Sequence, residues 1–413
     1  MAGPAGPRRG SAQGELGIVR DGALAAGADG RILAVGTTAE VRGAVHLAPD
    51  ARVIDATGRA VLPGFVDPHT HAIFAGDRAD EFARRLEGAD YLEILAAGGG
   101  ILSTVRATRA ASESELAERA RGYLAEMLRH GTTTVEIKSG YGLTVEDELK
   151  LLRVARSLDQ HGPPAVVPTF LGAHTVPPEY RDRPDAYVDL VTEEMVPRVA
   201  EEGLARFCDV FCERDVFSVE QSRRILAAGR AHGLAPKVHA DQKTPLGGAR
   251  LAATLGAVSA DHLEHAAEED LHALARAGTV AVLLSGAALM LMETVQAPAR
   301  RMIELGVPVA LATDFNPGTC PILSVPLIVG LACLRRLLTP AEVIVAATLN
   351  AAYAVGLGEQ VGSLEPGKRA DVVILDAPSH LHLAYWFGSN LVHTVVKDGR
   401  VVVEHGRRVP FAR

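Results

Sequence analysis

The sequence predicts an α/β protein, a (β/α)8 TIM barrel with a small β-sandwich domain built from both chain termini. Eight short apolar runs alternate with amphipathic helical stretches in the middle of the chain, whereas both ends hold β-like runs separated by hairpin-turn signals. Alternating strands and helices imply a parallel sheet, and eight such units over about 250 residues match a barrel. A doubly wound open sheet is the alternative, but no G-x-G-x-x-G motif follows the first strand.

The barrel strands are predicted from apolar runs that mostly end in polar residues. They are residues 60–71, 132–140, 165–174, 207–213, 236–241, 258–265, 279–286 and 307–314. The helices between them carry capping signals. Ser218 and Gln221 form a capping box for a helix that stops at Gly233. Thr244, which is followed by proline, predicts the start of another helix, which ends near Gly256.

Three segments are expected along the chain. Residues 1–60 form the N-terminal part of the small β domain, with about the first 14 residues disordered because they are rich in Gly and Pro. Residues 61–358 form the barrel, and residues 359–413 return to the small domain. The pairs Asp21-Gly22 and Asp398-Gly399 place hairpin turns in the two terminal segments.

The bulk properties argue against several classes of function. The net charge of -8 argues against nucleic acid, whose binding needs a basic face. The N-terminus lacks the apolar stretch of a secretory signal, and the most apolar segment, residues 279–292, is too short to span a bilayer. The four cysteines lack both disulfide-framework and zinc-site spacing, so they are expected in the core. We therefore expect a cytoplasmic protein with no nucleic-acid or membrane partner.

Polar residues follow several predicted strands at the end where a barrel enzyme keeps its active site. His69 and His71 stand at i and i+2, so both rings face the same way after the first strand. The fifth predicted strand ends in His239, the sixth in His262 and the eighth in Asp314. Three histidines and one carboxylate suit zinc, with iron or manganese as alternatives. A lone His-x-His is often coincidental, and Asp314 could merely start an Asx turn, but the joint pattern favours a metal site.

Several stretches carry a resemblance to a known family. They are LPGFVDPHTHAIFAGDRADEF, TTTVEIKSGYGL, TFLGAH, KVHADQ, DHLEH, VALATDFNPGT and GSLEPGKRADVVILD. In its His-x-His, two further histidines and late aspartate, the chain resembles the amidohydrolase superfamily of metal-dependent hydrolases. More narrowly, it resembles the imidazolonepropionase family, whose members hydrolyse the cyclic amide of 4-imidazolone-5-propanoate to N-formimidoyl-L-glutamate in histidine degradation. The resemblance covers nearly the whole chain, residues 15–405.

The resemblance implies a role for each matching residue. One Zn²⁺ or Fe³⁺ per chain would be bound by His69, His71, His239 and Asp314. The substrate would contact Arg78, Tyr141 and His174, and the ring-opened product would contact Asn316, Gly318 and Thr319. Asp314 would act as general base and acid, and His262 would assist it beside the metal-activated water.

Gln242 departs from a common superfamily pattern, in which Glu stands three residues after the histidine of strand five. An amide cannot shuttle a proton, so Gln242 is expected to hydrogen-bond the ring. The alternative function is another cyclic amidohydrolase or a nucleobase-type deaminase, which would rely on Glu at that position. A non-catalytic barrel is a further alternative, although all four expected metal ligands are present.

Two further points stay open at the level of the sequence. Glu213, at the end of the fourth strand, keeps a second metal possible, but it could also form a plain salt bridge with Lys138. A homodimer is expected, because barrels with an added β domain often pair. Residues 330–338 could serve that interface, although the inner face of a barrel helix is the favoured interpretation.

Overall fold

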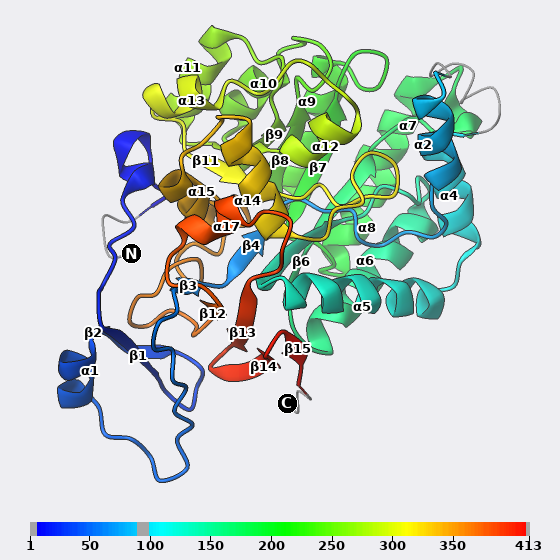
Figure 1. The fold of residues 1–413 in the computed structure, drawn as a ribbon. Helices are drawn as coiled ribbons and strands as arrows, with labels where there is room; N and C mark the ends of the chain where they lie inside the picture. Colours follow the sequence, from blue (N-terminus) through cyan, green and yellow to red (C-terminus); the bar gives the residue numbers. More distant parts are fainter. Residues whose placement is uncertain (1–5, 89–98, 410–413) are drawn as a thin grey trace.

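The computed structural model describes residues 6–88 and 99–409. A parallel eight-stranded barrel fills the larger part of the molecule, and a small antiparallel β domain lies at one end (Figure 1). The barrel strands follow each other in chain order, each hydrogen-bonded to the next. They are β4 (Phe65–Asp67), β5 (Thr132–Lys138), β6 (Ala165–Ala173), β7 (Phe207–Cys212), β8 (Ala235–Ala240), β9 (Ser259–His262), β10 (Val280–Leu283) and β11 (Val309–Leu311). All eight predicted strands, and with them the barrel, are confirmed.

The barrel closes between its first and last strands mainly beyond their ends. β4 and β11 share no regular ladder, but Thr70 and Phe315 form a parallel bridge. The amide of Asp314 donates to the His69 carbonyl at 3.1 Å, and the amide of His71 donates to the Phe315 carbonyl at 2.8 Å. The seam that closes the barrel is therefore made by the segments that carry three of the predicted metal ligands.

The first apolar run is split between the two domains. β3 (Val61–Pro63) pairs with β12 (Val372–Leu375) in the small sheet, and only β4 enters the barrel. Gly64 separates them, and a Cβ there would collide with the side chain of Thr133. The barrel thus begins after residue 64, not at residue 61 as expected, because the chain passes from one sheet directly into the other.

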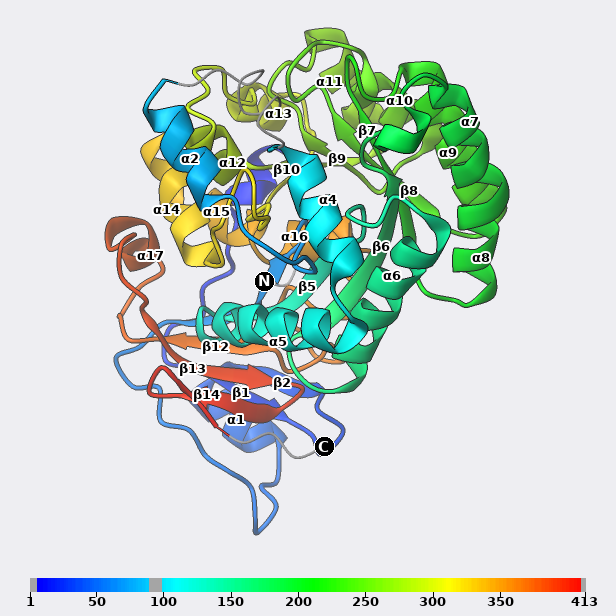
Figure 2. The same ribbon diagram turned by 90° about the vertical axis from the view of Figure 1, so that its right-hand side faces the viewer.

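Helices surround the barrel (Figure 2). They are α2 (Ala79–Leu86), α4 (Ile101–Ala110), α5 (Glu113–Arg129), α6 (Val145–Gln160), η2 (Pro178–Tyr180), α7 (Pro184–Leu190), the π-helix η3 (Val191–Met195), α8 (Val196–Glu201), α9 (Val219–Ala231), α10 (Gly248–Leu255), α11 (Glu268–Ala277), α12 (Ser285–Met290), α13 (Ala299–Glu304), α14 (Val325–Leu334), α15 (Pro340–Ala346), α16 (Leu349–Ala354) and α17 (Leu381–Tyr385). Within the described residues, no helix is both long and apolar enough to cross a membrane.

The capping signals hold in one helix and fail at the start of another. The Ser218 capping box begins α9 as predicted. Helix α10 ends at Gly256 as predicted but begins at Gly248, not after Thr244. The Thr244 hydroxyl donates to Glu213 instead, and the carboxylate of Asp241 accepts the amides that open the helix, including that of Gly248 at 3.1 Å. A side chain from the preceding strand end therefore caps this helix.

The small domain joins both ends of the chain. β1 (Gly22–Ala26) and β2 (Ile32–Thr37) form a hairpin followed by α1 (Thr38–Ala44), and β3 and β12 continue into β13 (Val392–Lys397), β14 (Arg400–Glu404) and β15 (Arg407–Arg408). The two sheets meet where the Ile32 amide donates to the Lys368 carbonyl at 2.8 Å. Leu24 of the hairpin packs on Val372, Ile374 and Val396, so the predicted second domain has its own apolar contact.

The N-terminal segment is more ordered than expected. Residues 1–5 lie outside the described part, but Gly10–Gly14 form the 3-10 helix η1. Gln13 is fully buried, and its side chain both donates to and accepts from the backbone of Val309, at 3.1 and 3.2 Å. Disorder over the first 14 residues is thus wrong for the described ones, because this segment packs against the last barrel strand.

Candidate active site and metal centre

One ring nitrogen of His69 is held by a hydrogen bond, and the other has no hydrogen-bond partner. Its Nδ1 lies 2.6 Å from Oδ2 of Asp261, and both side chains are fully buried. Donation to a carboxylate requires the proton on Nδ1, so Nε2 carries a lone pair. That Nε2 is buried and has no hydrogen-bond partner. An unpaired buried acceptor is costly, and a metal ion would satisfy it.

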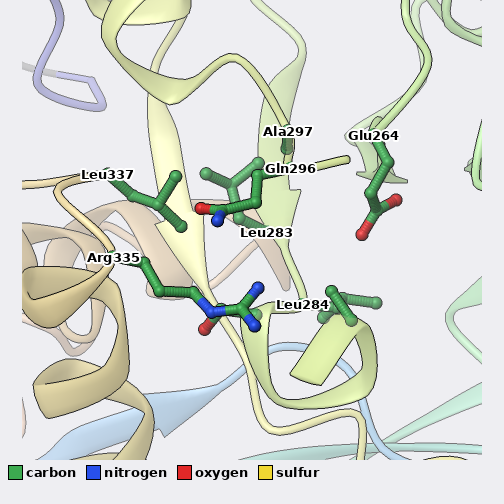
Figure 3. Close-up of a pocket in the computed structure, with 9 residues that line it drawn as sticks. Glu264, Leu283, Leu284, Gln296, Ala297, Arg335 and Leu337 are labelled. Atoms are coloured by element: carbon green, nitrogen blue, oxygen red, sulfur yellow. The ribbon is translucent and has the colours of Figure 1, made fainter. Parts of the chain in front are cut away.

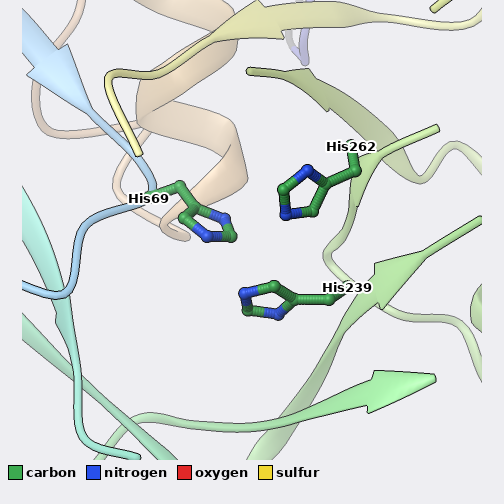
Figure 4. Close-up of side chains that lie close together, drawn as sticks. All are labelled: His69, His239 and His262. Carbon is green, nitrogen blue, oxygen red and sulfur yellow. The ribbon is translucent and has the colours of Figure 1, made fainter. Parts of the chain in front are cut away.

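The other predicted ligands gather around this nitrogen. Oδ1 of Asp314 lies 3.6 Å from Nε2 of both His69 and His71. The ring of His239 is centred 4.5 Å from that of His69, and the ring of His262 is 5.3 Å from that of His239 (Figure 4). Two triads have ligand atoms within 4.8 Å of one another; they are His69, His239 and His262, and His69, His71 and Asp314. The donor set fits a transition-metal ion.

Burial sets the protonation of these groups. It lowers the pKa of His69 and of His71 well below the ordinary value, with the neighbouring cations acting in the same direction. Both rings are therefore neutral near pH 7, as metal binding requires. Burial also raises the pKa of Asp314 well above the usual carboxyl range. The site thus combines neutral imidazoles with a buried carboxyl group.

The backbone at the strand ends is held in an uncommon conformation. Asp314 has φ 54°, His262 has φ 78° and Asp241 has φ 50°. Non-glycine residues seldom adopt the left-handed region, and such strain is concentrated at functional sites. Here it turns the side chains that follow β8, β9 and β11 toward positions that a regular strand would not reach.

Tyr141 and His174, the predicted substrate contacts, lie beside the predicted metal ligands. The His174 ring stacks on His71 at 5.0 Å and 14°, and Tyr141 is centred 5.4 Å from His174. Nδ1 of His174 lies 3.0 Å from the Gly140 carbonyl and donates to it, and burial lowers the pKa of His174 to about 3. Glu148 accepts the amides of the loop that carries Tyr141, including that of Gly140 at 3.0 Å.

Arg78 is close to the predicted product-binding loop. Its guanidinium group lies so near Gly318 that a Cβ there would collide with it. Its Nε donates to Oε2 of Glu81 at 2.7 Å. Glu81 also accepts the amide of Gly100 at 2.9 Å. Arg78 is therefore aimed by a carboxylate that is itself anchored.

Asn316 uses its side chain within its own loop. The amide group donates to the Asp314 carbonyl at 2.7 Å, and its oxygen accepts the amides of Gly318 and Thr319 at 2.9 and 2.7 Å. This Asx turn fixes the segment after Asp314. Gln242 follows β8 and is half-buried beside the same end of the barrel.

The alternative roles of Glu213 and Lys138 are not supported. Glu213 accepts the backbone amides of Lys243 and Thr244, at 2.8 and 3.3 Å, so it braces the loop after β8. Lys138 is fully buried inside the barrel and binds Asp209 at 2.8 Å, so the proposed Lys138–Glu213 salt bridge is wrong. Side chains across a barrel meet according to the stagger of its strands, which residue spacing alone does not give.

Sequence reasoning missed the acidic side chains that support this site. Asp209 and Asp261 interrupt the apolar runs FCDVFC and SADH, and that interruption was the available signal. Glu264, just after β9, lies 3.9 Å from His262 and faces a small cavity of about 10 Å³ (Figure 3). Burial raises the pKa of Glu264 to about 7. The cavity is also lined by Ser285 and Arg335.

The comparisons with known proteins agree with this architecture. The model of the amidohydrolase family matches residues 60–402, so the chain belongs to the amidohydrolase family. The chain is 59% identical over 408 residues to a protein named imidazolonepropionase from Symbiobacterium thermophilum, covering 98% of this chain and 95% of that one. It is 52% identical over 394 residues to another so named from Geobacillus sp. (strain WCH70), covering 95% and 92%. The narrower resemblance predicted from the motifs is thereby confirmed.

A solved structure supports the fold independently. An adenosine deaminase from Xanthomonas campestris with bound zinc superposes with a TM-score of 0.72, at 22% identity, and the match covers 97% of this chain and 92% of that one. At this identity the likeness shows the shared fold alone. The likeness therefore supports the overall fold described above.

Proposed function

We propose that the protein hydrolyses the cyclic amide of 4-imidazolone-5-propanoate to N-formimidoyl-L-glutamate. The observation that carries this proposal is the convergence of His69, His71, His239 and Asp314, next to a side of the site that holds Arg78, Tyr141 and His174. A metal cluster suits hydrolysis, and a guanidinium group suits a substrate with a carboxylate arm. The similarity to proteins named imidazolonepropionase supports this substrate over that of a nucleobase deaminase.

The metal site would hold one ion per chain, Zn²⁺ or Fe³⁺, between His69, His71, His239 and Asp314. A metal ion needs ligand atoms with lone pairs that lie close together. Nε2 of His69, which has no hydrogen-bond partner, and Oδ1 of Asp314, 3.6 Å away, meet this need. A bound ion of this kind supplies Lewis acidity, which polarises the amide carbonyl and makes a water molecule a better nucleophile at neutral pH. Elemental analysis of the purified protein tests which metal is present, and we expect about one equivalent of metal per chain.

Asp314 is proposed to move the proton. In the reaction the water oxygen bonds to the ring carbonyl carbon, the carbon–nitrogen bond breaks, and the departing nitrogen gains a proton. A carboxylate within reach of the water can take its proton and deliver it to that nitrogen. Asp314 is held for this task by the seam to His69 and by the hydrogen bond from Asn316 to its carbonyl.

The remaining residues are proposed to bind and orient. His262 would donate to the oxyanion that develops on the carbonyl oxygen, an effect often worth a few kcal/mol. Arg78 would bind the propanoate carboxylate, and Tyr141 and His174 would contact the substrate nearby. Gln242 would hydrogen-bond the ring. Asn316, Gly318 and Thr319 would contact the ring-opened product, with Asn316 acting mainly through the shape of its loop.

The direct test follows the ultraviolet absorbance of synthetic 4-imidazolone-5-propanoate after the purified protein is added. We expect absorbance to fall, no ammonia to be released, and the activity to disappear with a chelator and return with Zn²⁺ or Fe³⁺. Stable absorbance in protein with a full equivalent of metal would refute the proposal. Release of ammonia from a purine or pyrimidine would favour the deaminase alternative.

The assembly is proposed to be a homodimer in the cytoplasm. Helix α14 turns Ile328 and Ala332 into the core, as the favoured interpretation of this segment required, but Leu334 at its end is exposed. Tyr385 and Trp386 at the end of the adjoining α17 are also exposed. Apolar surface of this kind favours association. We expect light scattering to give twice the mass of one chain, and a monomer at all concentrations would refute the dimer.

A further inference from the structure

The interior of the barrel holds an unusual group of charges. Five fully buried side chains occupy strands β5, β7, β8 and β9; they are Glu136, Lys138, Asp209, Lys237 and Asp261. Barrel interiors are ordinarily filled by branched apolar side chains. Buried ions are costly unless they are well paired, and apolar replacements are often at least as stable. Stability alone therefore gives a weak reason for this cluster.

Lys138 stands at the centre of the group. Its Nζ lies 2.8 Å from Oδ2 of Asp209, 2.9 Å from Oε2 of Glu136 and 3.7 Å from Oδ2 of Asp261. These three carboxylates come from three different strands. One ammonium group thus joins the walls of the barrel directly beneath the end where the metal ligands lie.

Two of these carboxylates continue to metal ligands. Oδ2 of Asp209 lies 3.1 Å from Nδ1 of His239, as a charge contact without hydrogen-bond geometry, and Oδ2 of Asp261 is hydrogen-bonded to Nδ1 of His69 at 2.6 Å. A carboxylate on the outer nitrogen of a ligating imidazole fixes the ring and its tautomer. In both cases the oxygen that faces Lys138 is the same oxygen that faces the histidine. The Lys138 ammonium group therefore helps to fix the positions of the Asp209 and Asp261 oxygens that face the two histidines.

We propose that Lys138 is a positioning residue for two of the four metal ligands. It fixes His239 through Asp209 by short contacts, and it supports His69 through Asp261 by a longer one. Because one cation serves both arms, two ligands from opposite parts of the barrel are oriented together. The inference rests on the proposed metal site and names residues that act on it without touching metal or substrate.

Lys237 gives a matched contrast inside the same barrel. It is equally buried, and its Nζ contacts Glu136 at 2.9 Å and the Pro68 carbonyl at 3.0 Å. Among the described residues, it has no ion pair within 4.0 Å to Asp209 or Asp261. Replacing it removes the same charge from the same interior without removing the contact to Asp209.

The test measures Zn²⁺ affinity of the metal-free full-length protein by competition with a chromogenic chelator. Lys138→Met and Asp209→Asn are each expected to raise the Zn²⁺ dissociation constant on the order of 10–100-fold. The double variant is expected to bind Zn²⁺ within about threefold of the single variant that binds it less tightly, because both changes cut the short connection through Asp209 and only the longer contact to Asp261 is left to lose. Lys237→Met combined with Asp209→Asn is expected to show multiplied effects, as for independent sites.

The absorption spectrum of the Co²⁺-loaded protein gives a second readout, since its bands report ligand geometry. We expect Lys138→Met to alter the spectrum and Lys237→Met to alter it less, because Lys237 contacts the Pro68 carbonyl next to His69 but not Asp209. An unchanged dissociation constant and spectrum for Lys138→Met would overturn the inference, as would multiplied effects of Lys138→Met and Asp209→Asn. If Lys138→Met does not fold by circular dichroism, the double variant, which keeps the net charge of the interior, is compared with Asp209→Asn alone. A further loss of tenfold or more in that comparison would also overturn the inference.

Metal binding is measured without substrate, so the two proposals fail separately. Wild-type protein that binds Zn²⁺ but leaves 4-imidazolone-5-propanoate intact would refute the proposed function alone. Full hydrolysis by the wild type, together with an unchanged Zn²⁺ affinity of Lys138→Met, would refute the positioning role alone.

Discussion

Two buried lysines in this molecule have similar surroundings and different consequences. Lys138 lies inside the barrel, and Lys397 lies in the small sheet, where it binds both oxygens of Asp371 at 3.0 and 3.1 Å. Lys397 also contacts Asp398, whose amide donates to Asp371. The polar chain in the small sheet therefore closes on itself within neighbouring strands. The chain from Lys138 ends at His69 and His239, and the second ring nitrogen of His69, Nε2, has no hydrogen-bond partner.

The contrast shows what separates a structural ion pair from one that belongs to a functional site. Burial and pairing are common to both places, so neither property identifies function. The difference is an unsatisfied donor or acceptor at the end of the polar chain, aimed at a place where other such atoms converge. Four changes test this distinction, from the largest expected effect to the smallest.

The largest effect is expected from Asp314→Asn. The amide keeps the shape but cannot take the proton and is a poor metal ligand, so kcat/KM should fall by about 10³-fold or more. Steady-state kinetics with 4-imidazolone-5-propanoate and a metal assay give the measurement. Activity within a few-fold of the wild type would show that Asp314 is neither the metal ligand nor the general base. The charged cluster around Lys138 would then have no clearer link to function than the ion pair of Lys397 in the small sheet.

Asp371→Ala is expected to lower the stability of the protein and to leave its activity unchanged. Removing one partner leaves Lys397 buried with only the half-exposed Asp398, which should cost about 3 kcal/mol of unfolding free energy. Burial raises the pKa of Asp371, opposed mainly by Lys397, so the carboxyl group depends on that cation. Denaturant unfolding measures the loss. The kcat of the remaining folded enzyme should match the wild type, and a large fall in kcat would break the distinction between the two regions.

Arg78→Ala is expected to have an intermediate and selective effect. A hydrogen-bonded contact to a charged group is worth roughly 1.5–3 kcal/mol, so KM should rise by about 10–100-fold. The Arg78 and Glu81 side chains are 16% and 18% exposed. The loss of Arg78 should therefore lower the free energy of unfolding by about 1 kcal/mol. Kinetics and thermal unfolding measured together provide the check. Glu81→Gln is the matched control, because it loosens the anchor of Arg78 and should raise KM less.

The sequence was informative at most places where a signal is local, although the Thr244 cap did not form. The i, i+2 spacing of His69 and His71, the strand-end histidines and the Ser218 capping box depend on neighbours along the chain, and each was found in place. Contacts between distant segments were not predictable in this way. Gln13 binds Val309 across nearly 300 positions of sequence, and the partner of Lys138 depends on strand stagger. The local pattern therefore located the predicted ligands, whereas packing determined the residues that support them.

The smallest effect is expected from Gln242→Glu. Gln242 follows β8 and is half-buried, so a carboxylate there would keep some hydration and replace the amide without a large desolvation cost. It could still accept a hydrogen bond from the ring but could no longer donate one, so kcat/KM should change by less than about tenfold. Steady-state kinetics on metal-loaded protein give the value, and Gln242→Ala provides the control that removes both functions. A complete loss of activity with the metal still bound would mean that donation by the Gln242 amide is essential. Activity would then depend on one hydrogen bond from this side chain, as the stability of the small sheet depends on the contacts of Lys397.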